Sequence, residues 1–236
     1  MNKTDFFLET ERAAQAGGAI PCTHITHAVE ADSQNNPCLL IVPSVFGFDS
    51  TFMLHCRRFV AAGLQVYALD SFWRSCPGPL EADESGVPQA MARMAALEDA
   101  DCDSDVSALA NYIRAQHPSV RVIGLGICFG GRPIARAACD KEIDSVVAWH
   151  GVRIGELGDR LSTLTCAGAL HYGAIDAWTP KEECDVLRDR FKDRPQLEIS
   201  VHDDCDHGFT HLNRASVFNQ NAYETAYRSV VRLAGA

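Results

Sequence analysis

The sequence of 236 residues lacks several features that define whole classes of protein. Its apolar residues never run to 18 in succession, so we expect no membrane-spanning helix. The apolar stretch near the N-terminus is limited to Phe6-Phe7-Leu8, and we expect no secretory signal peptide. No internal repeat, low-complexity tract or linker interrupts the chain. With 47% hydrophobic and 22% charged residues, the composition also excludes a disordered, collagen-like or coiled-coil chain.

Basic residues are scarce relative to acidic ones. The chain has 21 lysines and arginines against 31 aspartates and glutamates, a formal net charge of −10. Such a field repels phosphate backbones, so we expect no nucleic-acid partner. The ten cysteines include no Cys-x-x-Cys pair, and a chain of this length needs no disulfide framework. We therefore expect a cytoplasmic protein with reduced thiols, most of them small core residues.

Short β-rich segments alternate with segments of helical periodicity. Apolar runs typical of strands buried on both faces occur at Cys38–Val42, Gln65–Leu69, Val120–Leu125, Ser145–Trp149, Cys166–Leu170 and Leu197–Val201. Helices are predicted at Ser104–His117, Pro133–Cys139, Pro180–Phe191 and Ser216–Leu233, with an acidic surface loop at Glu81–Pro88. The alternation predicts one α/β domain over residues 1–236, with a mostly parallel sheet covered by helices on both faces.

The most informative segment joins the third predicted strand to a helix. It reads Gly126-x-Cys128-x-Gly130, the spacing of a nucleophile elbow with cysteine in place of the commoner serine. The turn requires glycines, because side chains two residues from the nucleophile would collide with the neighbouring strand and helix. Backbone N–H groups at the start of the following helix lower the pKa of a thiol and stabilise an oxyanion. The alternative interpretation is a tight strand–helix turn with a buried cysteine.

Two further candidate residues follow later strands. Asp176 comes after the strand at Cys166–Leu170, and His207 comes after the strand at Leu197–Val201. Open α/β sheets carry their sites at the carboxyl ends of the strands, so we expect both side chains beside Cys128. The order nucleophile, acid, histidine along the chain is that of the α/β-hydrolases. The sequence therefore predicts a triad of Cys128, His207 and Asp176.

With these residues identified, the chain resembles the dienelactone hydrolase family from about Ile20 to Leu233. The residues that carry the resemblance are Gly126-Ile-Cys128-Phe-Gly130-Gly131, Phe46-Gly47, the Asp70–Gly78 segment, Asp176 and His207-x-Phe209. Members of that family open ester or lactone bonds of small anionic substrates through a cysteinyl acyl-enzyme. The resemblance implies an α/β-hydrolase fold and a carboxylic ester hydrolase with Cys128 as nucleophile, His207 as base and Asp176 as orienting acid. It also implies an oxyanion hole formed by the backbone N–H groups of Val45 and Phe129.

Two positions depart from the pattern of the family. Ser44 replaces a glutamate that takes part in activating the thiol, so direct proton transfer between cysteine and histidine is the simpler expectation. The family binds its substrate carboxylate with two arginines. Arg74 matches the first, whereas His211 occupies the position of the second. A neutral imidazole offers one donor and no charge, which favours another small ester or lactone over dienelactone itself.

Two ring side chains complete the candidate site. His150 ends one predicted strand and Trp178 lies two residues after Asp176, so both are expected to line the pocket. A structural histidine and a packed aromatic are equal alternatives. The run His202-x-x-Cys205-x-His207-x-x-x-His211 lacks the paired spacing of structural zinc sites, and we expect no metal. The glycines before Cys128 lack the third glycine of a dinucleotide-binding turn, and we expect no cofactor.

The sequence thus predicts a thiol hydrolase that opens the ester or lactone bond of a small substrate, with an anionic substrate as one option. The alternative is a non-catalytic α/β-hydrolase-like protein that binds a small molecule, because Ser44 and His211 change groups that the family uses. A thioesterase acting on a small acyl carrier is a third option. We expect a monomer or weak dimer with neither a membrane nor a nucleic acid as partner.

Overall fold

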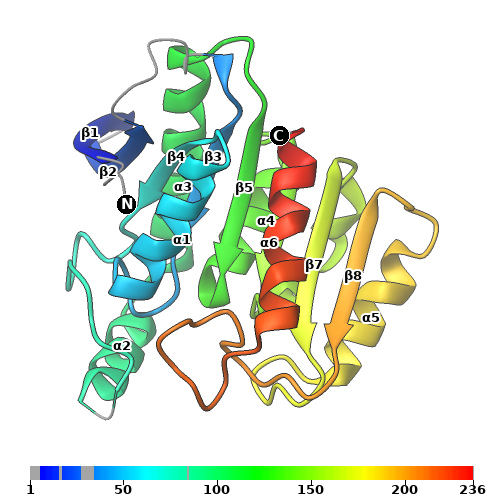
Figure 1. The fold of residues 1–236 in the computed structure, drawn as a ribbon. Coiled ribbons are helices and arrows are strands. Elements are labelled where there is room, and N and C mark those ends of the chain that lie inside the picture. The colour runs from blue at the N-terminus through cyan, green and yellow to red at the C-terminus, as the bar shows by residue number, and fades with distance from the viewer. Residues whose placement is uncertain (1–5, 16–17, 28–34, 84, 236) are drawn as a thin grey trace.

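A central sheet organises the fold (Figure 1). The computed structural model describes residues 6–15, 18–27, 35–83 and 85–235. The strands within them are β1 (Phe6–Gln15), β2 (Gly18–His27), β3 (Cys38–Val42), β4 (Gln65–Leu69), β5 (Val122–Ile127), β6 (Ser145–Trp149), β7 (Ala167–Gly173) and β8 (Leu197–His202). Their order across the sheet is β1-β2-β4-β3-β5-β6-β7-β8. The six neighbouring strands β4, β3, β5, β6, β7 and β8 are parallel. Strand β2 pairs antiparallel with β4, and β1 pairs antiparallel with β2.

Helices cover both faces of this sheet. Helices α1 (Ser50–Ala61) and α6 (Gln220–Ala234) pack on one face, and α3 (Asp99–Gln116) and α4 (Gly131–Cys139) pack on the other (Figure 1). Helix α5 (Lys181–Phe191) packs beside β8, and α2 (Gly86–Ala95) precedes α3. Two 3₁₀ segments, η2 (Cys128–Gly130) and η3 (Ile154–Thr163), follow β5 and β6. The predicted mostly parallel α/β sheet with helices on both faces is confirmed.

The apolar runs in the sequence form the centre of the core. Every residue of β3, β4, β5 and β6 is buried, as expected for parallel strands covered on both faces. Local polar contacts fix the helices on either side. The Asp49 side chain is the N-cap of α1 and accepts from the Phe52 N–H at 2.7 Å. The Asn219 side chain is the N-cap of α6 and accepts from the Ala222 N–H.

Several elements differ from the sequence-based expectation. The sequence pattern predicts no strand at β1 or β2 and no helix at α1. Glu81–Pro88 was expected to be a loop, but α2 begins at Gly86 and includes Pro88, since proline is tolerated in the first turn of a helix. Helix α3 begins at Asp99, before the expected Ser104, and α6 begins at Gln220, after the expected Ser216.

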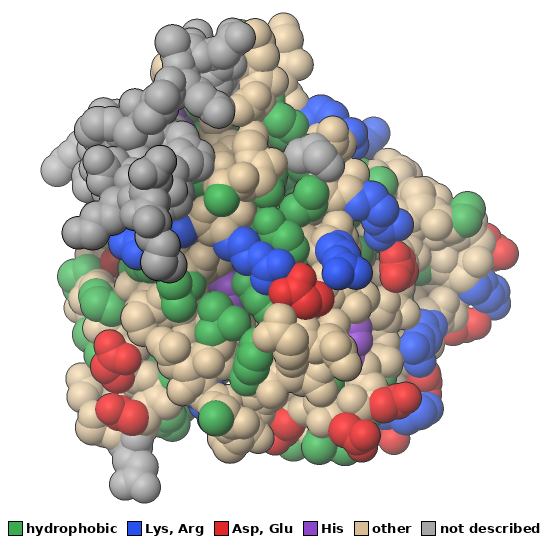
Figure 2. Space-filling model, in the orientation of Figure 1, with side chains coloured by type: hydrophobic (Ala, Val, Ile, Leu, Met, Phe, Trp, Pro, Cys, Tyr) green, Lys and Arg blue, Asp and Glu red, His purple; other side chains and the backbone are tan. Residues whose placement is uncertain are grey.

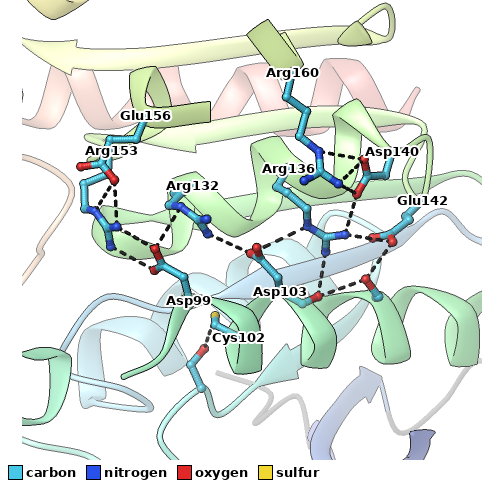
Figure 3. Close-up of polar contacts among 12 residues, drawn as sticks. Asp99, Cys102, Asp103, Arg132, Arg136, Asp140, Glu142, Arg153, Glu156 and Arg160 are labelled. Atoms are coloured by element: carbon cyan, nitrogen blue, oxygen red, sulfur yellow. Dashed lines mark hydrogen bonds and ion pairs between the residues drawn. The ribbon is translucent and has the colours of Figure 1, made fainter. Parts of the chain in front are cut away.

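Ion pairs attach α4, the helix that follows Cys128, to α3 (Figure 3). Arg132 Nη1 lies 3.0 Å from Asp103 Oδ1, and Arg136 Nη2 donates to the Asp103 carbonyl at 2.8 Å. Arg136 Nη1 lies 2.9 Å from both Asp140 and Glu142, although only 5% of the Arg136 side chain is exposed. A nearly buried guanidinium with this many acceptors holds the two helices in one relative orientation. The start of α4 is thereby fixed beside the turn that carries Cys128.

The surface carries charges of both signs. On the face shown in Figure 2, blue and red side chains alternate over the half of the molecule formed by the later strands and helices, and the described side chains there form no continuous basic area. Among the described residues, no helix combines the length and the apolar character needed to cross a membrane.

Two buried histidines couple the stability of the fold to pH. His55 Nδ1 lies 3.1 Å from the Tyr223 hydroxyl, and His171 lies between His202 and Ser229. Burial lowers the pKa of His55 to about 3, and burial together with the neighbouring His202 lowers the pKa of His171 to about 4. Both rings are therefore neutral in the folded protein at neutral pH.

We expect acid to destabilise the fold as the pH falls from about 6.5 towards 4. An unfolded histidine has a pKa near ~6.5, so in this window the unfolded state binds more protons, and the stability present above it is lost. Each buried histidine contributes about 1.4 kcal/mol per pH unit there. Denaturant unfolding at several pH values measures the slope of the free energy of unfolding against pH. His171→Asn should reduce this slope by about 1.4 kcal/mol per pH unit. A slope unchanged in His171→Asn would contradict the assignment.

Candidate active site

A cavity of about 170 Å³ opens at the carboxyl ends of the parallel strands. Cys128 follows β5, His150 follows β6 and His207 lies in the segment after β8, and all three line the cavity. Apolar side chains make up much of the remaining wall: Val45, Phe46, Phe52, Val87, Met91, Met94, Ile127, Val152 and Trp178. Helix α2, which the sequence analysis did not predict, supplies three of them, Val87, Met91 and Met94.

Cys128 sits on the sharp turn that the glycine spacing indicates. A Cβ atom on Gly126 would lie 2.2 Å from the Gly130 carbonyl oxygen, so only glycine allows the chain to reverse so closely. Cys128 itself has a φ of 56°, in the left-handed region that residues with a side chain rarely adopt. Strain of this kind persists only where the surrounding structure enforces it. Here β5 and α4 hold the turn from both sides, and Sγ is presented to the cavity.

Three polar side chains from separate loops meet at this turn. His207 Nε2 lies 3.2 Å from Cys128 Sγ, and His207 Nδ1 lies 2.9 Å from Asp176 Oδ2. The Asp176 side chain is fully buried, and its Oδ1 accepts from the backbone N–H groups of Trp178 and Thr179. These bonds fix the carboxylate, which in turn orients the imidazole. The arrangement links a thiol, an imidazole and a carboxylate in one line.

The charges in this line stabilise a protonated His207. Burial opposes protonation of the ring, but interactions with Cys128 and with the Asp176 carboxylate outweigh it and raise the pKa of His207 to about 10. A thiolate next to an imidazolium is the reactive state of a nucleophilic cysteine.

The two residues expected to supply the N–H groups of an oxyanion hole follow β3 and β5. Phe129 is in the first turn of η2, where backbone N–H groups have no partner within the helix. Val45 follows β3 and lines the cavity. Its carbonyl accepts from Arg93 Nε at 2.7 Å, and Arg93 Nη1 also donates to the Cys76 and Gly78 carbonyls.

Arg93 is a residue that the sequence analysis missed. Only 3% of it is exposed, and it stacks over the Phe72 ring at 4.2 Å. Its bonds to three backbone carbonyls hold the segment after β3 and the Asp70–Gly78 segment together. No motif surrounds it in the sequence, because the carbonyls that it binds belong to distant loops.

Ser44, His150 and Trp178 all line the cavity. Ser44 Oγ accepts from the Phe46 N–H at 3.3 Å, so its hydroxyl also stabilises the loop. His150 is 3% exposed, and its Nε2 lies 2.9 Å from Thr210 Oγ1. Trp178 is 56% exposed at the edge of the cavity, with its ring centroid 6.2 Å from that of His207.

Arg74 lies elsewhere. It was expected to contact a substrate carboxylate, but it does not line the cavity, and its two Nη atoms lie 2.5 and 2.8 Å from the carboxylate of Asp105. Asp105 on α3 is fully buried, and the pair raises the pKa of the Arg74 guanidinium. A buried carboxylate needs a charged partner, which is the physical reason that Arg74 lies beside Asp105.

His211 lines the cavity, but both of its ring nitrogens already have partners. Nε2 lies 2.9 Å from Asp49 Oδ2, and Nδ1 lies 3.3 Å from Thr51 Oγ1. A carboxylate on a substrate would therefore meet a histidine whose ring nitrogens are already hydrogen-bonded to Asp49 and Thr51. The expectation that His211 binds an anion is weakened by this pair.

Arg214 is the cationic side chain that the cavity does present. It is the one arginine or lysine among the described residues that line the cavity, and it also lines a shallow groove next to it. Among the described residues its guanidinium has no acidic partner. A Cβ atom on Gly208, which follows His207, would lie 3.4 Å from Arg214 Nη1. The guanidinium thus reaches the segment that carries His207.

The His202-to-His211 run does not gather around one point. His202 stacks on His171, whereas His211 pairs with Asp49. In the described part of the chain, the donor atoms that do converge belong to Cys128, His150 and His207.

Comparison with known proteins gives a consistent result. The family model of the dienelactone hydrolase family matches residues 25–235. A carboxymethylenebutenolidase of Pseudomonas putida is 23% identical over 176 residues, covering 73% of this chain and 75% of that protein. These similarities support a hydrolase.

Solved structures show the same fold. A protein from Klebsiella pneumoniae subsp. pneumoniae assigned as a dienelactone hydrolase is 21% identical, with a TM-score of 0.81 over 98% of this chain and 99% of that one. A dienelactone hydrolase-like promiscuous phosphotriesterase from metagenomic libraries is 19% identical, with a TM-score of 0.74 over 97% and 98% of the two chains. The α/β-hydrolase fold is thereby confirmed. Because the family model spans most of the sequence, the protein belongs to the dienelactone hydrolase family.

Proposed function

We propose that the protein is a thiol-dependent hydrolase that opens the ester or lactone bond of a small substrate through a cysteinyl acyl-enzyme. The observation that carries this proposal is the line from Cys128 Sγ to His207 Nε2, at 3.2 Å, and from His207 Nδ1 to Asp176 Oδ2, at 2.9 Å, at the wall of an apolar cavity. Nucleophile, base and orienting acid are within the reach that covalent catalysis requires.

The chemical steps follow from this geometry. The Cys128 thiolate attacks the carbonyl carbon, and the N–H groups of Val45 and Phe129 stabilise the charge that develops on the carbonyl oxygen. The protonated His207 donates its Nε2 proton to the leaving alkoxide, which leaves a thioester on Cys128. His207 then takes a proton from a water molecule, which attacks the thioester and releases the carboxylate product.

This scheme needs no carboxylate at position 44. The raised pKa of His207 favours a proton on its imidazole beside the sulfur, so direct proton exchange between cysteine and histidine suffices. Ser44 contributes through its bond to the Phe46 N–H, which supports the loop that carries Val45. Arg93 fixes the same loop through the Val45 carbonyl.

The cavity favours a substrate with an apolar body and a peripheral anionic group. Side chains such as Phe46, Phe52 and Met91 form apolar walls that suit a hydrocarbon body. Arg214 supplies a permanent positive charge near the mouth, next to Gly208. In this proposal Arg214, and neither Arg74 nor His211, is the residue that binds a substrate carboxylate.

Cys128→Ala should reduce turnover of an activated aryl ester to less than about a thousandth of wild type, since it removes the nucleophile. The free energy of unfolding should change by less than about 1 kcal/mol, because one sulfur atom at a turn is lost. Intact-mass analysis of wild type mixed with the ester should show one acyl group, absent in Cys128→Ala and retained in Cys76→Ser, which changes an exposed cysteine. A wild type that binds the ester without acylation would instead support the non-catalytic binding protein.

Arg214→Met and Arg74→Met form a matched pair that tests substrate charge. Arg214→Met should lower the ratio of kcat/KM for an anionic ester to that for its neutral isostere by about tenfold or more, because a charge-assisted hydrogen bond is lost. Arg74→Met should leave that ratio unchanged and reduce the free energy of unfolding by roughly 2–3 kcal/mol, since the buried Asp105 then keeps the Trp73 indole N–H as a donor but loses its charged partner. The opposite pattern would restore Arg74 as the anion-binding residue.

A further inference from the structure

Three soft or borderline donor groups meet at the base of the cavity. One ligand atom from each of Cys128, His150 and His207 lies within 4.8 Å of those of the other two. Zinc binds cysteine sulfur at about 2.3 Å and histidine nitrogen at about 2.0 Å, which places tetrahedral ligands roughly 3.3–3.6 Å apart. Cys128 Sγ and His207 Nε2 are already 3.2 Å apart. The third donor atom lies within 4.8 Å of both, so a small movement of the His150 ring would complete the three-ligand geometry.

His150 has a donor atom with no other use. Its Nδ1 is buried and has no hydrogen-bond partner, whereas its Nε2 lies 2.9 Å from Thr210 Oγ1. Burial and the neighbouring His207 hold the pKa of His150 well below its usual range, so the ring is neutral. An imidazole that donates Nε2–H to Thr210 has its lone pair on Nδ1, the form that binds a metal ion.

The contacts behind the two imidazoles match those of established metal sites. A histidine that binds a metal generally donates its other ring N–H to a carboxylate, carbonyl or hydroxyl group, which fixes the tautomer and the ring orientation. His207 has Asp176 in that position, and His150 has Thr210. The buried orphan Nδ1 of His150 is the feature that the hydrolytic scheme leaves unexplained.

We propose that Cys128, His150 and His207 form a reversible Zn²⁺ site that inhibits the protein, with the fourth zinc position open to water. The proton balance is simple. Cys128 and His207 together share one proton, which is displaced to solvent when Sγ and Nε2 both bind the metal. No electron transfer occurs, and a chelator reverses the binding. The binding step does not depend on the identity of the substrate or on turnover.

The test measures metal binding directly on the purified full chain. Zn²⁺ is titrated in competition with a chromophoric chelator, and Co²⁺ is titrated in parallel to detect the near-ultraviolet charge-transfer band of a cobalt–thiolate bond. We expect one ion per chain and a thiolate band. Cys128→Ala should remove the band, and His150→Ala should weaken Zn²⁺ binding by at least tenfold, the low end of what even outer contacts to metal ligands contribute.

Two controls separate this site from other thiols and imidazoles. Cys76→Ser removes an exposed cysteine, and His202→Gln removes one member of the His171–His202 pair, so both should bind Zn²⁺ as wild type does. Zn²⁺ affinity should also rise about tenfold per pH unit between pH 6 and 8, because binding displaces one proton.

The outcomes are distinct. Alkylation of Cys128 by iodoacetamide should abolish Zn²⁺ binding in the wild-type protein. This experiment still tests the site if His150→Ala does not fold. Zn²⁺ binding that survives this alkylation, a cobalt complex without a thiolate band, or a His150→Ala protein with wild-type affinity would each overturn the three-ligand site. Failure of ester hydrolysis would leave these binding results unchanged, so the two proposals fail separately.

Discussion

The parallel alignment of the strands from β4 to β8 is the constraint on which the candidate site depends. Parallel strands end at one edge of the sheet, so the segments after β3, β5, β6, β7 and β8 are brought to the same place. The residues that meet at this edge are far apart in the sequence. Val45, Cys128, His150, Asp176 and His207 lie together because backbone hydrogen bonding fixes the register of each strand against the next.

A residue of the candidate site could be predicted from the sequence only where a local sequence pattern marks it. Cys128, Asp176 and His207 could be located because each follows an apolar strand and one has a glycine spacing that the turn requires. The roles of Arg74 and Arg214 could not. The role of Arg74 depends on the face of α3 that presents Asp105. The role of Arg214 depends on where the segment after His211 turns. β1, β2 and α2 were missed because their sequences are rich in charged, small or proline residues. Their regular structure depends on tertiary contacts: β2 pairs with β4, β1 pairs with β2, and α2 packs over the cavity.

Charge compensation accounts for the positions of many polar residues around the cavity. Arg74 neutralises the buried Asp105, His211 hydrogen-bonds to Asp49, and Arg93 satisfies carbonyls that would otherwise lie buried without a donor. Each of these groups has a structural partner before any substrate arrives. Among the described groups that line the cavity, the Arg214 guanidinium has no acidic partner and the His150 Nδ1 atom has no hydrogen-bond partner, and these are the groups for which we propose ligands. Unsatisfied polar atoms thus point to function more directly than matched ones do.

The wall that α2 contributes has a consequence for selectivity. Met91 and Met94 place two unbranched thioether side chains over the cavity, and methionine adapts its shape at little energetic cost. A wall of this kind discriminates poorly between acyl groups that differ by a methyl branch or a ring. We therefore expect the protein to be promiscuous towards the shape of the hydrocarbon body and selective towards its charge.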